Sequence, residues 1–285
     1  MSKGSNTRSG LLWEVERILN ELKESDSLPQ VLLMENVPDI IGKKNYKDFM
    51  QWYAALEGMG YQSYYKLLNA KNFGIPQNRN RCFMVSILGD YNYEFPKEMP
   101  LKLCLKDMLE DEVDEKYYLS KKLIKGFIEH TKRHKEKGNG FLWKPKTEDD
   151  IANALTAHQG FSPTDNSIID STVKHIGNCM SIKNRGNQNQ DIVIGAMPAN
   201  AAINYDGISP TMTAAMGIGG GHVPMYSDEN LRIRKLTPFE CWRLMGFTDE
   251  DFHNAEKVNS NSQLYKQAGN SIVKQVLMAI FKEMM

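Results

Sequence analysis

The feature that most constrains the fold is a short apolar run, Val31 to Met34, which stops abruptly at the polar pair Glu35-Asn36. Such a run is typical of a buried strand in a parallel sheet, and α/β proteins place their sites at the carboxyl ends of these strands. A helix is predicted over residues 46–59, and further strands over 61–69 and 82–88. The alternation of strand and helix predicts an α/β sheet for the first part of the chain.

The rest of the chain divides by composition. We expect a first domain over residues 1–110, a second over 111–230, and a final segment, 231–285, made of a hinge and a C-terminal helix that returns to the first domain. Most of the second domain is rich in Gly, Asn, Ser, Thr and Pro, which predicts a loop-rich, mostly β unit. In the final segment, Thr237-Pro238-Phe239-Glu240 predicts a capped helix start, and Gly269-Asn270-Ser271 is expected to open the last helix.

Composition limits the compartment and the class of protein. The chain carries 35 basic and 35 acidic residues, and this balance neither supports nor excludes a nucleic-acid partner, because only local patches decide that. It has no apolar stretch of about 18 residues, and residues 1–10 lack an apolar signal core, so we expect a cytoplasmic protein without membrane contact. Four cysteines without a CxxC pair favour neither disulfides nor a metal site.

Three charged residues form the strongest candidate site. Glu35 follows the first strand, and Arg79 and Arg81 lead into the strand over 82–88. Alternate residues of a strand point to the same side, so the two arginines are expected on one face. A carboxylate and two guanidiniums at one sheet edge could grip a polar, planar ligand. On these residues alone, an ion pair that braces two strands is an equal alternative.

Four sequence blocks in a fixed order extend this interpretation. They are Glu35-Asn36-Val37, Gln77-x-Arg79-x-Arg81, Arg234-Lys235-Leu236-Thr237-Pro238-x-Glu240-x-x-Arg243-Leu244-Met245-Gly246-Phe247 and Gln267-x-Gly269-Asn270-Ser271. Together they resemble the later motifs of DNA cytosine-5 methyltransferases, with a long variable region between the second and third blocks. The resemblance implies an α/β fold: a partial, Rossmann-like sheet of an S-adenosylmethionine-dependent methyltransferase with an inserted, mostly β target recognition domain.

The resemblance also assigns roles to single residues. Glu35 would hold a flipped cytosine through ring N3 and the exocyclic amine, Arg81 would contact the base carbonyl, and Arg79 would brace the pocket. Asn270 and Ser271 would help to surround the cofactor S-adenosylmethionine; an N-capped helix also explains them, and both can hold. The implied function is DNA (cytosine-5-)-methylation of bacterial or phage modification type, with double-stranded DNA as partner and no metal.

Two elements of the family are not found in the sequence. The family's nucleophile sits in a Pro-Cys pair, and no cysteine here follows a proline. The Gly-rich stretch 216–221 lacks the strand-to-helix context of a cofactor loop. The first residues resemble the mobile loop behind the Pro-Cys pair. We therefore expect the C-terminal portion of an enzyme, inactive alone, that is either truncated or split from an N-terminal partner subunit. The alternative is a non-catalytic DNA-binding or regulatory remnant.

Candidate groove readers lie in the variable region, because Arg suits guanine and Asn or Gln suits adenine. They are Asn184, Arg185, Gln188 and Gln190. An Asn-rich solvated loop is the alternative. Thr211 and Thr213 belong to a segment that resembles the family's Thr-Leu element behind the flipped base, a role for which residues 154–157 compete. The basic residues over 121–137 could meet phosphates, or could form an exposed helix face.

Overall fold

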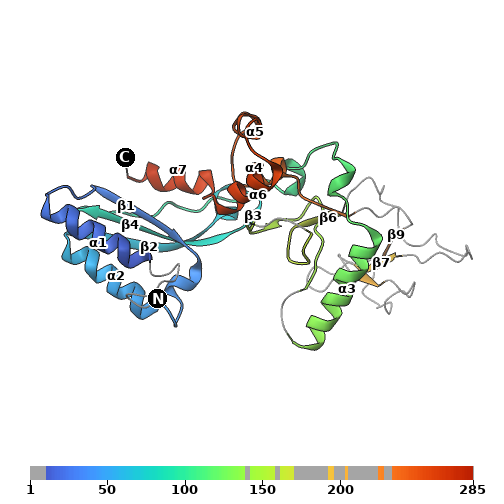
Figure 1. The fold of residues 1–285 in the computed structure, drawn as a ribbon, viewed down its shortest axis with the longest axis horizontal. Coiled ribbons are helices and arrows are strands. Elements are labelled where there is room, and N and C mark those ends of the chain that lie inside the picture. The colour runs from blue at the N-terminus through green and yellow to red at the C-terminus, as the bar shows by residue number, and fades with distance from the viewer. Residues whose placement is uncertain are drawn as a thin grey trace, which may run out of the picture. The chain divides into compact units, whose positions relative to one another are not determined.

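The computed structural model describes residues 11–138, 142–157, 161–169, 192–195, 203–204, 224–227 and 233–284 (Figure 1). These residues form two compact units. Unit 1 takes in the described residues of 1–103, 244–247 and 271–285, and unit 2 takes in those of 104–243 and 248–270. Within these ranges, no helix combines the length and the hydropathy needed to cross a bilayer.

Unit 1 is built on a three-stranded sheet. Its strands are β1 (Val31–Asn36), β2 (Tyr61–Asn69) and β4 (Asn80–Leu88), in the order β1-β4-β2. The strand β4 is antiparallel to both neighbours, with Glu35 opposite Phe83 in one pairing and Leu68 opposite Arg81 in the other. All three strands lie where the apolar runs predict them.

The direction and burial of β1 correct one expectation. Its apolar run predicts a buried strand between parallel neighbours, but among the described strands β1 pairs only with the antiparallel β4, and its residues are half-buried or exposed. The connection through α2 (Tyr46–Gly58) leaves β1 and β2 parallel to each other, and β4 then inserts between them. Strand direction depends on such connections, which an apolar run does not encode.

Helices cover both faces of this sheet in Figure 1. On one face, α1 (Leu11–Glu24) and α2 enclose an apolar core that includes Cys82 and Met84 of β4. Because side chains alternate along a strand, Glu35 and Arg81 point to the opposite face. On that face α7 (Lys274–Lys282) packs near the 3-10 turn η3 (Ala70–Phe73). The candidate site residues therefore lie on the α7 side of the sheet. The shorter elements of unit 1 are η2 (Pro38–Ile41) and β3 (Gln77–Asn78).

Unit 2 combines one long helix with short strands. The helix α3 (Lys121–Glu136) starts at Ser120, whose side chain accepts a hydrogen bond from the backbone N–H of Leu123, and its apolar face packs on Trp143 and Ile233. Two antiparallel arrangements are described, β6 with β10 and β7 between β8 and β9. The strands are β5 (Ala152–Asn153), β6 (Ser167–Ile169), β7 (Ile192–Gly195), β8 (Ile203–Asn204), β9 (Pro224–Ser227) and β10 (Ile233–Lys235).

Three helices near the C-terminus also belong to unit 2: α4 (Pro238–Arg243), α5 (Asp249–Glu256) and α6 (Asn261–Asn270). The sequence predicts that 231–285 contains a hinge and a C-terminal helix that returns to the first domain. In the structure 244–247 and 271–285 belong to unit 1, and the other described residues of this segment belong to unit 2. The physical reason is the packing of α4 on α6, where Trp242 Nε1 donates to the carbonyl of Leu264 at 3.0 Å. Two 3-10 turns complete unit 2, η4 (Leu105–Asp107) and η5 (Glu115–Tyr117).

The block Gly269-Asn270-Ser271 does not open the last helix, as the sequence predicts. Gly269 and Asn270 end α6, and α7 begins at Lys274, behind an N-cap residue that makes no side-chain capping bond. A Cβ atom on Gly269 would lie 2.2 Å from the carbonyl carbon of Thr156. Glycine is therefore required by the close approach of two backbones, and not by a turn.

Candidate functional site

The centre of the candidate site is an ion pair between β1 and β4. Arg81 Nε lies 3.0 Å from Glu35 Oε1, and the two side chains are 19% and 21% exposed. Glu35 stands opposite Phe83, so Arg81 is its diagonal neighbour on the same face, within reach of a long side chain. A second guanidinium nitrogen, Arg81 Nη1, donates to the carbonyl of Asn80 at 2.8 Å. The structure thus brings together the first two predicted site residues.

Arg79 lies behind this pair and is buried. Its Nη2 donates to the carbonyl of Ser271 at 2.9 Å, and the residue is only 5% exposed. Burial and the charge of Arg81 lower the pKa of Arg79 and the charge of Glu35 opposes them, so that the pKa is about 10. The guanidinium therefore remains charged at neutral pH and senses both members of the ion pair. This position suits the bracing role predicted for Arg79.

Gln77 is a residue of this site to which the sequence assigns no role. Its side chain is fully buried, and its Nε2 donates to the carbonyl of Leu244 at 2.7 Å. The next residue of that segment, Met245, accepts from the backbone N–H of Lys274 at 3.0 Å. Gln77 thereby ties the strand entry to 244–247, and that segment holds the start of α7. The sequence shows only an amide side chain two positions before Arg79. It cannot show the partner of that amide, because Leu244 is 167 residues away.

The stability that this ion pair can contribute helps to decide whether it braces the sheet or faces a ligand. An ion pair that retains this much contact with water contributes roughly 0–1 kcal/mol to stability. The strands β1 and β4 are already joined along their full register, from Val31 opposite Ile87 to Asn36 opposite Cys82. The pair is therefore poorly suited to holding the sheet together. A carboxylate that accepts and guanidiniums that donate suit the polar edge of a planar ring instead.

Asn270 and Ser271, the residues predicted to bind the cofactor, could form only part of a site for S-adenosylmethionine. Asn270 is exposed at the end of α6, and Ser271 offers its carbonyl to Arg79. These two residues cannot account for the carboxylate, amine, ribose and adenine of S-adenosylmethionine together. Among the residues that the structure describes, no Gly-rich turn joins a strand to a helix. Their role in cofactor binding stays a prediction.

Two of the described cysteines, Cys82 and Cys241, have buried thiols. Cys82 is fully buried in the α1–α2 core, and burial, with the charge of Glu35, raises the pKa of its thiol to about 11. Burial also raises the pKa of Cys241. Cys104 is partly exposed, with its Sγ 3.5 Å from a carboxylate oxygen of Asp107. A buried, protonated thiol is unreactive, because the thiolate is the nucleophile. Cys179 lies outside the described residues.

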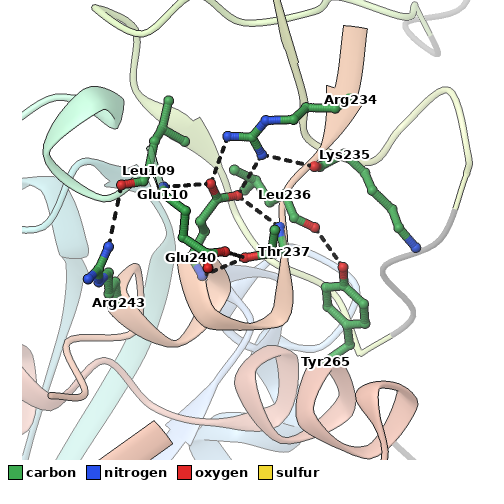
Figure 2. A network of polar contacts seen from close by, with 9 residues as sticks. All are labelled: Leu109, Glu110, Arg234, Lys235, Leu236, Thr237, Glu240, Arg243 and Tyr265. Carbon is green, nitrogen blue, oxygen red and sulfur yellow. Dashed lines mark hydrogen bonds and ion pairs between the residues drawn. The ribbon is translucent and has the colours of Figure 1, made fainter. Parts of the chain in front are cut away.

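The third sequence block builds a buried clamp in unit 2 (Figure 2). Arg234 pairs with both carboxylate oxygens of Glu240, at 2.7 and 2.8 Å, and the two side chains are 4% and 0% exposed. The capping box is confirmed: Thr237 N donates to Glu240 at 2.8 Å, and Glu240 N donates to Thr237 Oγ1 at 3.2 Å. The described partners of this carboxylate are all groups of unit 2, so the clamp fixes the junction between β10 and α4.

Glu110 joins this clamp although the sequence gives no sign of it. Its backbone N–H donates to Glu240 Oε1 at 3.0 Å, and its carboxylate accepts a hydrogen bond from Thr237 Oγ1. Burial raises the pKa of Glu110, with the charge of Glu240 acting in the same direction and the bond from Thr237 opposing it. Two carboxylates thus share one pocket of unit 2, while Arg234 and Arg243 supply the nearby positive charge.

Several predicted residues cannot be placed. The candidate DNA-reading residues lie outside the described residues; they are Asn184, Arg185, Gln188, Gln190, Thr211 and Thr213. The competing segment 154–157 is described, with Leu155 buried and the backbone of Thr156 seated against Gly269. In the described part of the chain, no group of three His, Cys, Asp or Glu side chains could hold a metal ion.

Comparison of the sequence with known families gives one match across the chain. Residues 2–285 match the family described as C-5 cytosine-specific DNA methylase. The chain is 34% identical over 284 residues to the type II methyltransferase M2.ScrFI of Lactococcus lactis subsp. cremoris, which covers 98% of this chain and 59% of that relative. It is 33% identical over 258 residues to the type II methyltransferase M.Bsp6I of Bacillus sp. strain RFL6, covering 88% and 64%. The chain thus spans about three fifths of the length of these curated relatives.

Comparison with solved structures shows a shared fold. The S. pombe Dnmt2 methyltransferase superposes with a TM-score of 0.61 at 17% sequence identity, covering 98% of this chain and 73% of that one. The Entamoeba histolytica methyltransferase EhMeth gives a TM-score of 0.56 at 17% identity, with coverages of 100% and 77%. At these identities the likeness bears on the α/β methyltransferase fold alone.

Proposed function

The chain belongs to the C-5 cytosine-specific DNA methylase family, and from this premise we propose that unit 1 holds a cytosine flipped out of double-stranded DNA for methylation at C5. The observation that carries the proposal is the ion pair of Glu35 and Arg81, 3.0 Å apart, with Arg79 buried behind it. Members of this family use S-adenosylmethionine as the methyl donor. The names of the relatives, type II methyltransferases, favour a role in restriction–modification.

The polar edge of cytosine complements these side chains. The exocyclic amine donates, the ring carbonyl accepts, and N3 takes a proton as a nucleophile adds to C6. Glu35 accepts from the amine and shares a proton with N3, which relieves the negative charge that develops on the ring. Arg81 turns its guanidinium from Glu35 to the carbonyl, where fixed donors and a permanent charge suit the oxygen. Arg79 holds the carbonyl of Ser271 behind the pair and does not touch the base.

Methyl transfer also needs a thiolate at C6, and we propose that polypeptide outside these 285 residues supplies it. No cysteine of the sequence follows a proline, and Cys82, the thiol nearest to Glu35 in the sheet register, is buried and protonated. The donor would be a partner subunit that carries the nucleophile and the cofactor loop. This chain alone is then inactive.

Exposed apolar side chains beside β1 support such a partner. Val31 and Val37, at the two ends of the strand, are 39% and 51% exposed, and Val15 and Ile18 of α1 are 43% and 42% exposed. Among the described strands, β1 has a neighbour on one edge only. An unpaired strand edge with apolar side chains is a template for a further strand. The sheet of unit 1 would thereby be extended to the Rossmann-like form that the resemblance implies.

We further propose that residues 111–230 form the target recognition domain. The antiparallel strands β7, β8 and β9 support a mostly β unit, and the Arg234–Glu240 clamp fixes the strand by which the chain leaves it. The groove-reading roles of Asn184, Arg185, Gln188 and Gln190 remain part of this proposal, as do those of Thr211 and Thr213.

The test is reconstitution. The chain is mixed with the portion of M2.ScrFI that lies outside the 59% it matches, and binding is measured by gel filtration. Methyl transfer from S-adenosylmethionine to phage DNA is then followed, and bisulfite sequencing locates each methylated cytosine. We expect a complex that deposits 5-methylcytosine in one short sequence context. A chain that neither forms the complex nor yields 5-methylcytosine would favour the alternative, a DNA-binding or regulatory remnant.

A further inference from the structure

Lys235 is a residue of the third sequence block to which the preceding roles give no function. It ends β10, and its Nζ lies 4.4 Å from the ring centroid of Phe161, 5.2 Å from that of Tyr265 and 5.7 Å from that of Tyr117. These rings come from three separate segments of unit 2. An ammonium within about 6 Å of a ring is attracted to its face. The ammonium of Lys235 therefore lies within attractive distance of three aromatic rings.

Two of the three rings are buried and hydrogen-bonded, and that of Phe161 is 43% exposed. Tyr265 is 5% exposed, and its hydroxyl donates to the carbonyl of Leu236 at 2.6 Å. Tyr117 is 8% exposed, and its hydroxyl accepts a hydrogen bond from Asn261 Nδ2 at 3.2 Å. The ammonium thus lies beside two buried tyrosine rings and the ring of Phe161, the three of which we call the aromatic box, and less rotamer entropy remains to be lost when it binds a ligand.

The charge of Lys235 is unpaired among the residues that the structure describes. Its neighbour Arg234 is matched by Glu240, and the nearby Lys116 lies 2.8 Å from Asp114, but Nζ of Lys235 makes no ion pair or hydrogen bond with a described residue. Figure 2 shows the Lys235 side chain pointing away from the carboxylates of the clamp. Burial lowers the pKa of this ammonium, and the charge of Asp165 opposes the change.

We propose that Lys235 is a binding site for a phosphate group of the DNA backbone, presented by the aromatic box of Tyr117, Phe161 and Tyr265. The inference rests on the proposed function, because it assumes that DNA is the ligand. Aromatic faces attract the cation without accepting strong N–H bonds, so its donors remain available for phosphate oxygens. A lysine acts on phosphate as a point charge and carries no base specificity. Lys235 therefore contributes affinity and register, and not sequence choice.

The test compares two lysines beside the same ring of Tyr117. Lys235→Gln and Lys116→Gln each remove one charge, but Lys116 is already neutralised by Asp114. The affinity of the full chain for one DNA duplex is measured at several salt concentrations between about 50 and 200 mM. We expect Lys235→Gln to lower the slope of log affinity against log salt by about one, and Lys116→Gln to change it far less. Lys235→Arg, which keeps the charge, should retain the wild-type slope.

A second measurement needs no variant. Duplex DNA should slow the acetylation of Lys235 in the wild-type chain, read by mass spectrometry, and leave the rate at Lys116 unchanged. Equal slopes for wild type and Lys235→Gln, or no protection of Lys235 by bound DNA, would overturn the inference while leaving the proposed function intact. If the wild-type chain bound no DNA at all, the inference and the DNA-binding part of the proposed function would both fall.

Discussion

Arg81 and Glu35 meet across two antiparallel strands, with Arg81 Nε 3.0 Å from Glu35 Oε1, one diagonal step away from the directly opposed residue. A second pair of the same chemistry, Arg234 with Glu240, lies in unit 2 at 2.7 Å. The two pairs differ in their surroundings: the first retains about a fifth of its side-chain exposure, and the second is almost wholly buried. This difference is the basis for proposing that the first pair binds a ligand and the second serves the structure of unit 2.

A double-mutant cycle on the first pair and a single substitution in the second test this division. We expect Glu35→Gln and Arg81→Gln to show a coupling energy of at most about 1 kcal/mol in urea unfolding, because the pair is in contact with water. Arg234→Met removes one member of the Arg234–Glu240 pair and should lower the free energy of unfolding by about 3–5 kcal/mol, because it leaves a buried carboxylate without its counter-charge. A large coupling at Glu35–Arg81 would instead identify that pair as the brace.

The burial of two cysteines leads to a prediction for trapping a covalent adduct between a thiol and DNA. DNA that contains 5-fluorocytosine captures the thiol adduct, because fluorine cannot leave as a proton does. Since the thiols of Cys82 and Cys241 are buried and their pKa values are raised, we expect no adduct from this chain alone on a denaturing gel. The reconstituted mixture serves as the positive control. An adduct formed by the chain alone, and abolished by replacing one of its own cysteines with Ser, would refute the external nucleophile.

Glu110 predicts a pH dependence of stability. Burial raises its pKa in the folded state, so the folded chain holds this proton more tightly than the unfolded chain. The resulting stabilisation is complete below its ordinary pKa of 4.5 and is lost as the pH rises through the folded-state pKa. Glu110→Gln keeps an oxygen for the Thr237 hydroxyl, so we expect it to be more stable than wild type near pH 8, with the gap closing toward pH 4.5. Asp111→Asn, at the exposed neighbour, is the control.

Replacing Gly269 with a larger residue should disturb the packing of α6. A Cβ atom at this position would meet the carbonyl of Thr156 at 2.2 Å, so Gly269→Ala must displace backbone, and we expect a loss of about 1–3 kcal/mol in unfolding free energy. Gly126 in α3 has nothing within 4 Å of its added Cβ, so Gly126→Ala should instead stabilise by roughly 0.5–1 kcal/mol through helix propensity. If both substitutions stabilised the chain, the close contact of α6 with the segment at Thr156 would be refuted.

The local parts of the fold were accessible from the sequence. The strands β1, β2 and β4 follow from their apolar runs, and the start of α4 follows from Thr237 and Glu240, because these signals lie within a few residues of each other. The strand order was not accessible. The placement of β4 between β1 and β2 depends on how distant segments pack, and an apolar run is compatible with either neighbour direction.

The site shows the same limit. Its charged residues could be named from the sequence, since Glu35 ends a strand and Arg81 shares a face with Arg79. The contact that supports this site could not, because Gln77 bonds to the carbonyl of Leu244. The same holds for the clamp of unit 2, where Glu110 bonds to Thr237, and both contacts span more than a hundred residues of sequence. Such contacts leave no periodicity or local motif, so only the folded chain reveals them.

The most direct test of the account is methyl transfer by the reconstituted enzyme with Glu35→Gln. An amide oxygen can still accept from the exocyclic amine, but an amide cannot share a proton with N3, so we expect 5-methylcytosine formation to fall by about 10²–10⁴-fold. Glu57→Gln, which removes an exposed carboxylate from α2, should methylate at the wild-type rate. If Glu35→Gln methylated DNA as fast as wild type, Glu35 would not hold the cytosine and the assignment of the site would be wrong.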